Sequence, residues 1–157
     1  MNTVSLIFDY CRSGDLLNLK KHIEAYPESV NFVLPNGFSP IIIASYNDQP
    51  EAAKILLENG AAINYQDQAG NTALMGVCFK GSFEMFQLLL KYGADIHLLN
   101  NNNANALTFA ATFGKTEMAR VLIEQGIHKF QVDNVGQTPY QKAVAQGNIE
   151  MMKLFED

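Results

Sequence analysis

The sequence has few cysteines and prolines, no tryptophan and no long hydrophobic run. Two of its 157 residues are cysteine and five are proline. Cys11 and Cys78 are too few for a disulfide framework or a four-ligand zinc site. We expect both to be buried free thiols, because unpaired cysteine behaves as a small apolar side chain. No apolar run approaches the roughly 20 residues that a membrane-spanning helix needs, so we expect no membrane partner.

Basic clusters are missing as well. The formal net charge is −5, and Lys20-Lys21 is the longest basic run. Binding to a phosphate backbone needs several Lys or Arg side chains on one face, so we expect no nucleic-acid partner. Residues 1–11 lack the basic start, apolar core and small-residue cleavage site of a secretory signal. A cytoplasmic location is therefore the expectation.

Patterns typical of catalysis or metal binding are absent. His22, His97 and His128 are isolated from one another, and no His-x-x-x-His or Cys-x-x-Cys pair occurs. The glycine patterns of a nucleophile elbow or a phosphate-binding loop do not occur either. We therefore predict a protein that is not an enzyme, with no catalytic residue, no metal site and no cofactor.

A repeat of 33 residues is what the sequence does contain. A turn residue and the similar six-residue block that follows it recur four times. A glutamate also recurs four times at the same 33-residue interval. The turn position is held by Gly37, Gly70, Asn103 and Gly136, the block by residues 39–44, 72–77, 105–110 and 138–143, and the acidic position by Glu51, Glu84, Glu117 and Glu150. A period of this length indicates a stack of small structural units, because one unit alone cannot bury its apolar face.

Each copy has the signals of two short helices. The blocks begin with residues whose side-chain oxygen can cap a helix N-terminus, and in two copies a proline follows at the first helical position. Glycines end both helices, since they adopt the left-handed conformation that a C-cap often requires. The N-cap candidates are Ser39, Thr72, Asn105 and Thr138, the prolines are Pro40 and Pro139, and the terminating glycines are Gly60, Gly81, Gly93, Gly114, Gly126 and Gly147.

The period and the Thr-Pro-Leu-like block resemble the ankyrin repeat. The resemblance implies an all-α solenoid of about five 33-residue helix–turn–helix repeats with short hairpin-like turns. We expect a single domain over residues 1–157, with repeats at about 1–33, 34–66, 67–99, 100–132 and 133–157, the first and last being degenerate caps. The family's usual His after Thr-Pro-Leu is absent from all copies, where Ile42, Met75, Thr108 and Gln141 stand.

The resemblance also implies a binding surface. In the ankyrin family this surface is concave and is formed by the hairpin tips and the exposed positions of the first helices. Carried onto this sequence, the candidate partner-binding residues are Phe38, Tyr46, Asn47, Asn71, Phe79, Lys80, Ala104, Thr112, Phe113, Gln137 and Gln146.

Four aromatic residues in this set are unusual. Phe38, Tyr46, Phe79 and Phe113 occupy positions that the repeat leaves exposed. Large exposed aromatic side chains are typical interface anchors, and polar neighbours then form a rim around them. The alternative is that individual rings tuck sideways against neighbouring helix ends.

From these residues we expect a monomeric module that docks a protein partner on its concave surface. Two alternatives stay open. The first is an inhibitor or immunity-type protein that neutralises a cognate enzyme or toxin, for which the acidic charge would suit a basic target. The second is a self-associating structural scaffold. Compact ankyrin proteins with no appended domain resemble bacterial accessory or immunity-type proteins, so we expect a bacterial source.

Overall fold

The computed structural model describes residues 3–156, and these residues form short helices and no strand. The helices come in pairs, each made of a first and a second helix. The pairs are α1 (Thr3–Ser13) and α2 (Leu16–Ala25), α3 (Pro40–Tyr46) and α4 (Pro50–Glu58), α5 (Ala73–Lys80) and α6 (Phe83–Lys91), α7 (Ala106–Thr112) and α8 (Thr116–Glu124), and α9 (Pro139–Ala145) and α10 (Ile149–Lys153), with a 3-10 helix η1 (Pro27–Asn31) after α2.

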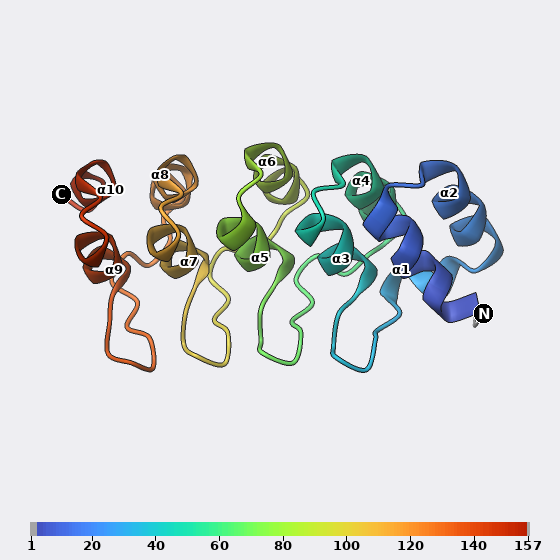
Figure 1. The fold of residues 1–157 in the computed structure, drawn as a ribbon, viewed down its shortest axis with the longest axis horizontal. Helices are drawn as coiled ribbons and strands as arrows, with labels where there is room; N and C mark the ends of the chain where they lie inside the picture. The colour runs from blue at the N-terminus through green and yellow to red at the C-terminus, as the bar shows by residue number, and fades with distance from the viewer. Residues whose placement is uncertain (1–2, 157) are drawn as a thin grey trace.

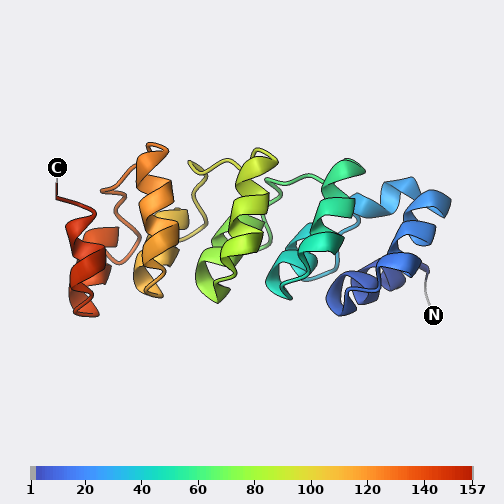
Figure 2. The same cartoon turned by 90° about the horizontal axis from the view of Figure 1, so that it is seen from above.

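The pairs stand side by side in one elongated array (Figure 1). The first helices form one row, the second helices form another, and the turns that precede α3, α5, α7 and α9 all project to the same side. Seen from above, the second helices run next to one another along the array (Figure 2). Each first helix packs against the first helix of the next pair, as α3 does against α5 and α5 against α7. The all-α solenoid that the sequence predicted is confirmed.

Capping explains where most of the first helices begin. The side chains of Thr72, Asn105 and Thr138 accept hydrogen bonds from the backbone N–H three residues on, at 3.2, 3.0 and 3.3 Å. Ser39 was predicted to do the same, and that prediction is wrong. Its Oγ is buried without a hydrogen-bond partner among the described residues. In the other three repeats the third helical residue returns a side-chain bond to the N-cap backbone, whereas Ile42 has no acceptor with which to do so.

The turn tips require left-handed backbone. Asn103 has a φ of 59° at the position that glycine holds in the other three tips, and Asn is one of the few other residue types that adopt positive φ. Asp48, which was not predicted to be left-handed, has a φ of 52° at the position that Gly81 holds one repeat later. Gly70 has a second reason to lack a side chain, because a Cβ there would lie 2.7 Å from the backbone nitrogen of Asn101 in the next turn.

Four consecutive asparagines at residues 100–103 join neighbouring turns to one another. The backbone N–H of Asn101 donates to the carbonyl of Ala69 at 3.0 Å, and that of Asn134 donates to the carbonyl of Asn102 at 2.9 Å. The Asn101 amide adds a bond to the carbonyl of Gln68 at 2.8 Å. These contacts fix the spacing of successive tips, so the asparagines have a structural role in the turns.

The core lies between the two rows of helices. Its largest members recur at the repeat interval, with Leu56, Leu89 and Leu122 fully buried in the second helices. Cys11 and Cys78 are buried and free in different pairs, as predicted. Within the described part of the chain, no helix has the length and apolar character needed to cross a membrane.

Candidate protein-binding surface

Three aromatic rings from successive repeats form one continuous patch, here named the aromatic stripe: Tyr46, Phe79 and Phe113. Tyr46 ends α3, Phe79 lies in the last turn of α5, and Phe113 directly follows α7. The Tyr46 and Phe79 rings stack with centroids 6.2 Å apart, and the Phe79 and Phe113 rings meet edge to face at 4.6 Å. The three residues are 43%, 39% and 43% exposed. The fold thus brings together three of the four predicted aromatics and leaves them accessible.

The stripe is ordered by its own contacts. Aromatic pairs in these geometries contribute about 0.5–1.5 kcal/mol beyond the area they bury. The Lys80 ammonium lies 4.5 Å from the centroid of the Tyr46 ring, a distance typical of a cation–π contact. Because the rings already hold one another in place, their side chains would lose little entropy when a partner docks on them.

Phe38 differs from the expectation. It is half-buried, packs against the core and makes no ring contact with the stripe within the described residues. For Phe38 the alternative is therefore the better description, because its ring packs sideways against the protein instead of joining the stripe. The reason is its place just before α3, where the chain turns inward to begin the helix at the buried Pro40.

A hollow of about 370 Å³ lies beside the stripe between the second and third repeats. Its lining includes the rings of Phe38, Tyr46, Phe79 and Phe109, together with Asp67 and Gly76. Its volume lies in the range of about 300–1,000 Å³ that is usual for ligand pockets. The hollow exists because Gly76 stands where the neighbouring repeats have Ile43 and Phe109. The hollow was not predicted from the sequence, although a glycine inside a helical block is a signal for such a space.

Of the remaining predicted residues, some are exposed and others form hydrogen bonds within the protein. Gln137 and Gln146 are exposed. Three others are half-buried and bonded within the protein. The Asn47 amide donates to the carbonyl of Ile43 at 2.8 Å, Asn71 Oδ1 accepts from the Asn100 amide at 2.8 Å, and the Thr112 hydroxyl donates to the carbonyl of Thr108 at 2.6 Å.

Ala104 was expected at an exposed tip, and this expectation is wrong. It is 6% exposed. Its N–H donates to Asn100 Oδ1 at 3.0 Å and its carbonyl accepts from the Asn100 N–H at 2.9 Å. These two bonds close the turn and leave the Ala104 side chain buried, so it cannot contact a partner.

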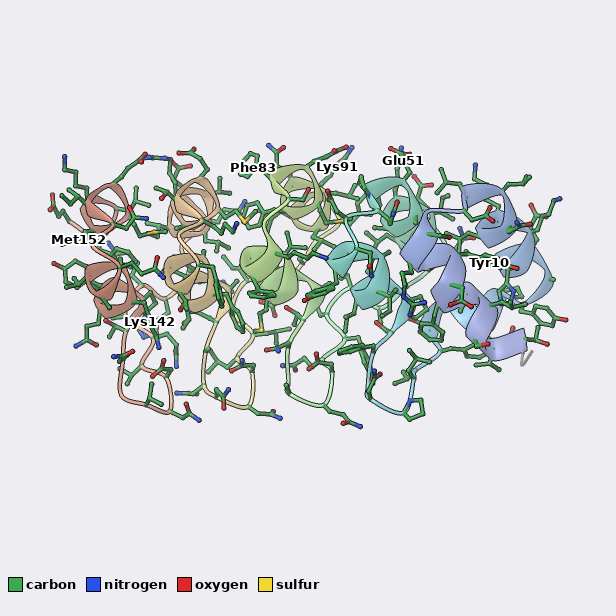
Figure 3. All side chains as sticks on the ribbon, viewed as in Figure 1. Tyr10, Glu51, Phe83, Lys91, Lys142 and Met152 are labelled. Carbon is green, nitrogen blue, oxygen red and sulfur yellow. The ribbon has the colours of Figure 1, made fainter. Side chains whose placement is uncertain are left out.

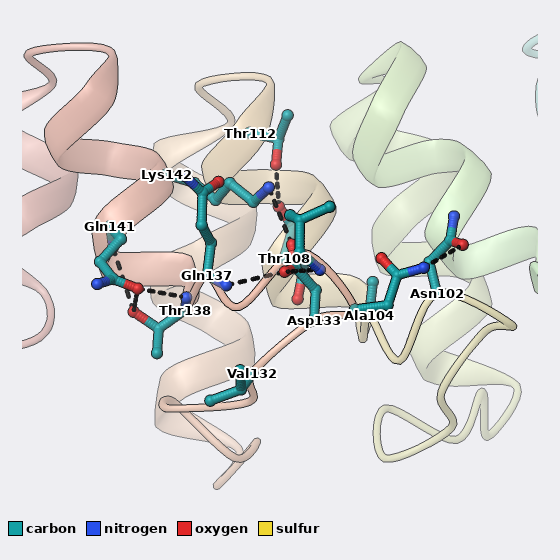
Figure 4. A network of polar contacts seen from close by, with 12 residues as sticks. Asn102, Ala104, Thr108, Thr112, Val132, Asp133, Gln137, Thr138, Gln141 and Lys142 are labelled. Atoms are coloured by element: carbon teal, nitrogen blue, oxygen red, sulfur yellow. Dashed lines mark hydrogen bonds and ion pairs between the residues drawn. The ribbon is translucent and has the colours of Figure 1, made fainter.

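A polar network that was not predicted from the sequence lies at the last repeat. The Lys142 ammonium lies 2.9 Å from Oδ2 of the nearly buried Asp133 (Figure 4). The Oδ1 atom of Asp133 accepts from the N–H groups of Val135 and Gln137. Burial raises the pKa of Asp133, but the backbone bond from Gln137, the Lys142 ammonium and the bond from Val135 together leave it below its usual value. The carboxylate is thus held in its charged form.

Acidic residues gather away from the stripe, on the second helices. One glutamate lies in the first turn of each of α4, α6, α8 and α10, where its negative charge interacts favourably with the positive end of the helix dipole. These residues are Glu51, Glu84, Glu117 and Glu150. Figure 3 shows the row of second helices with Glu51 on α4 and Phe83 and Lys91 on α6. Arg120 bridges two of these acids, at 3.5 Å from Glu117 and 3.7 Å from Glu150. Among the described residues, no group of three or more His, Cys, Asp or Glu side chains could hold a metal ion.

Comparisons with known proteins agree with this architecture. The chain is 34% identical over 77 residues to the E3 ubiquitin-protein ligase XBAT33 of Arabidopsis thaliana, a match that covers 48% of this chain and 15% of that protein. It is 32% identical over 76 residues to protein phosphatase 1 regulatory subunit 27 of Mus musculus, covering 48% of this chain and 49% of that protein. It is 36% identical over 66 residues to BTB/POZ domain-containing protein 3 of Schizosaccharomyces pombe, covering 42% and 13%. The matches therefore span half or less of these relatives.

The family comparison covers far more of the chain. The sequence profile described as ankyrin repeats (3 copies) matches residues 7–100 and again residues 75–156. Such repeats generally mediate contacts between proteins and are typically not catalytic. With both matches and the helix pairs in agreement, the chain belongs to the ankyrin-repeat family.

Proposed function

We propose that this protein is a non-catalytic binding module that docks a partner protein on the aromatic stripe. The observation that carries the proposal is the continuous contact of Tyr46, Phe79 and Phe113 across three repeats while each ring stays exposed. Exposed aromatic patches of this kind are rare on surfaces without a binding role, and aromatic residues are enriched among those that dominate binding energy.

Neighbouring groups support the same surface. Lys80 lies over the stripe, and the hollow next to it offers a recess for a side chain of the partner. An apolar centre with polar residues at its margin is the usual arrangement of a protein interface. One relative is named as a regulatory subunit of protein phosphatase 1, which is consistent with a module that acts by binding another protein.

The test compares two triple variants in a pull-down from the lysate of the source organism. One replaces Tyr46, Phe79 and Phe113 with Ala. The matched control replaces Leu17, Phe130 and Ile149 with Ala, since these apolar residues are also exposed but lie outside the stripe. Circular dichroism first establishes that both variants fold. We expect wild type and the control to capture the same protein. The stripe variant should capture at least tenfold less of it. Equal capture by all three would place the binding surface elsewhere.

Two narrower forms of the proposal have their own signatures. An acidic inhibitor of a basic enzyme or toxin would associate at a rate that falls steeply with salt, and a flat dependence would exclude that form. A self-associating scaffold would show a mass in light scattering that rises with concentration and returns to the monomer mass in the stripe variant. A monomer at all concentrations would exclude the scaffold.

A further inference from the structure

The four turn-and-helix repeats can be compared at two positions nine residues apart, one in the turn and one in the first helix. The pairs are Leu34 and Ile43, Asp67 and Gly76, Asn100 and Phe109, and Asp133 and Lys142. In the last pair the two side chains meet, with the Lys142 ammonium 2.9 Å from Asp133 Oδ2. A lysine at the helix position can therefore reach an aspartate at the turn position of the same repeat.

Asp67 is held in the same way as Asp133. Its Oδ1 accepts from the N–H groups of Ala69 and Asn71, both at 2.9 Å, just as Asp133 Oδ1 accepts from Val135 and Gln137 at 3.1 and 2.9 Å. The shared bonds give the two carboxylates matching orientations. In the described part of the chain no lysine or arginine forms an ion pair with Asp67.

The space that a lysine would occupy beside Asp67 is open. A Cβ added to Gly76 would meet only Tyr46 Cδ2, at 4.0 Å, and both Asp67 and Gly76 line the hollow. The other walls include the Phe38, Tyr46, Phe79 and Phe109 rings. Aromatic rings accommodate the methylene stem of a lysine and attract its ammonium through the negative face of the ring.

We propose that the hollow receives a lysine side chain from the partner protein, with its stem against the aromatic rings and its ammonium on Asp67 Oδ2. This inference rests on the proposed function and names the anchor that the proposed binding surface recognises. An uncharged apolar anchor would bury the half-exposed carboxylate without a counter-ion, which is costly. Arginine suits two parallel acceptors, whereas Asp67 Oδ1 is already occupied by two backbone donors.

The direct test is an NMR titration of the labelled protein with Nα-acetyl-lysine N-methylamide. The uncharged comparison is Nα-acetyl-norleucine N-methylamide, which has the same stem without the ammonium. We expect the lysine probe to shift the amide resonances of Asp67 and Gly76 at millimolar concentration, at least tenfold more tightly than the norleucine probe. Equal binding of both probes, or no shift at these resonances, would overturn the proposal.

Variants of the protein supply a second readout. Gly76→Lys should fill the hollow from within, raise Tm and abolish binding of the lysine probe. The rise in Tm should be smaller in the Asp67→Asn background, whereas the rise produced by Gly76→Leu should be the same in both backgrounds. A Tm gain from Gly76→Lys that does not depend on Asp67 would contradict the proposed geometry.

The pull-down separates this inference from the proposed function. Loss of the partner in Gly76→Lys, with the stripe intact, supports the lysine anchor. Capture by Gly76→Lys at the wild-type level, together with loss in the stripe variant, would overturn the anchor and leave the stripe in place.

Discussion

Asp67 and Asp133 occupy the same repeat position and make the same backbone contacts, yet one residue nine positions later gives them different surroundings. Lys142 neutralises Asp133, while Gly76 leaves a hollow next to Asp67. The free energy of such a pair depends on pH. The pKa of Asp133 lies below its usual value in the folded state, so its contribution to stability is present above the unfolded pKa and is lost as pH falls through the folded one.

Replacing Lys142 with Met tests this dependence. At pH 7 we expect the free energy of unfolding to fall by about 1–3 kcal/mol, because a nearly buried carboxylate loses its charged partner. The deficit should shrink as pH falls below about 4, because the carboxyl group protonates first in the variant, which lacks the ammonium, and only at lower pH in the wild type. Urea denaturation at pH 7 and pH 3 measures it, with Lys153→Met as the control for an exposed lysine. A deficit of equal size at both values would mean that the ion pair contributes nothing.

The two non-glycine residues with positive φ in the described part of the chain differ in how clearly their residue type indicates that conformation. Asn103 adopts positive φ where its residue type and the repeat both indicate it, and its amide also donates to the carbonyl of Val132 at 2.8 Å. Asp48 adopts positive φ because the repeat demands a turn there, although its own residue type is a weaker signal. Alignment of the copies against one another predicts such positions better than residue type alone.

At the scale of the helix, capping decides how sharply each first helix begins. Thr72 accepts from the Met75 N–H, whereas Ser39 makes no cap bond and its Oγ is buried without a partner in the described structure. The two residues have the same sequence position in the repeat but different energetic roles. Removal of the hydroxyl should therefore destabilise the protein at Thr72 but not at Ser39.

We predict that Thr72→Ala lowers the free energy of unfolding by about 1 kcal/mol, as loss of an N-cap does. Ser39→Ala should be neutral or stabilising, because it removes a buried polar group that has no partner. Chemical denaturation of both variants measures the difference. A cost for Ser39→Ala as large as that for Thr72→Ala would show that Ser39 caps α3 after all.

Across the whole molecule, the stack depends on contacts between neighbouring pairs. α5 packs against both α3 and α7, whereas α1 packs against α3 and η1. Cys11 and Cys78 lie in α1 and α5 and report on these two places. Burial raises the pKa of the Cys11 thiol to about 12 and raises that of Cys78 as well, so neither supplies the reactive thiolate in the folded state.

Thiol labelling should therefore need local or global opening of the array. In single-cysteine variants made by Cys→Ala replacement, we expect labelling at least tenfold slower in buffer than in urea, with Cys11 faster than Cys78. Iodoacetamide modification followed by mass spectrometry measures both rates. Native rates equal to those in urea would contradict the burial of the thiols, and equal native rates for the two would indicate that the array opens as one unit.

Much of the fold could be predicted from the sequence because its signals are local. Capping residues, prolines at first helical positions and glycines at left-handed turns act within a few residues, and the 33-residue period repeats them. The same register placed Tyr46, Phe79 and Phe113 at exposed positions, as the structure has them. What the stripe binds stays a prediction.

Only the tertiary structure decided which side chains meet within one repeat and which meet the next repeat. The inward packing of Phe38, the burial of Ala104 and the hollow at Gly76 all depend on which side chains the neighbouring turn and helix bring close. The bridge from Lys142 to Asp133 likewise depends on the fold of the turn between them. Residue type and periodicity determine which face of a helix is apolar, but close packing between repeats determines where that face leaves a space and which charges meet.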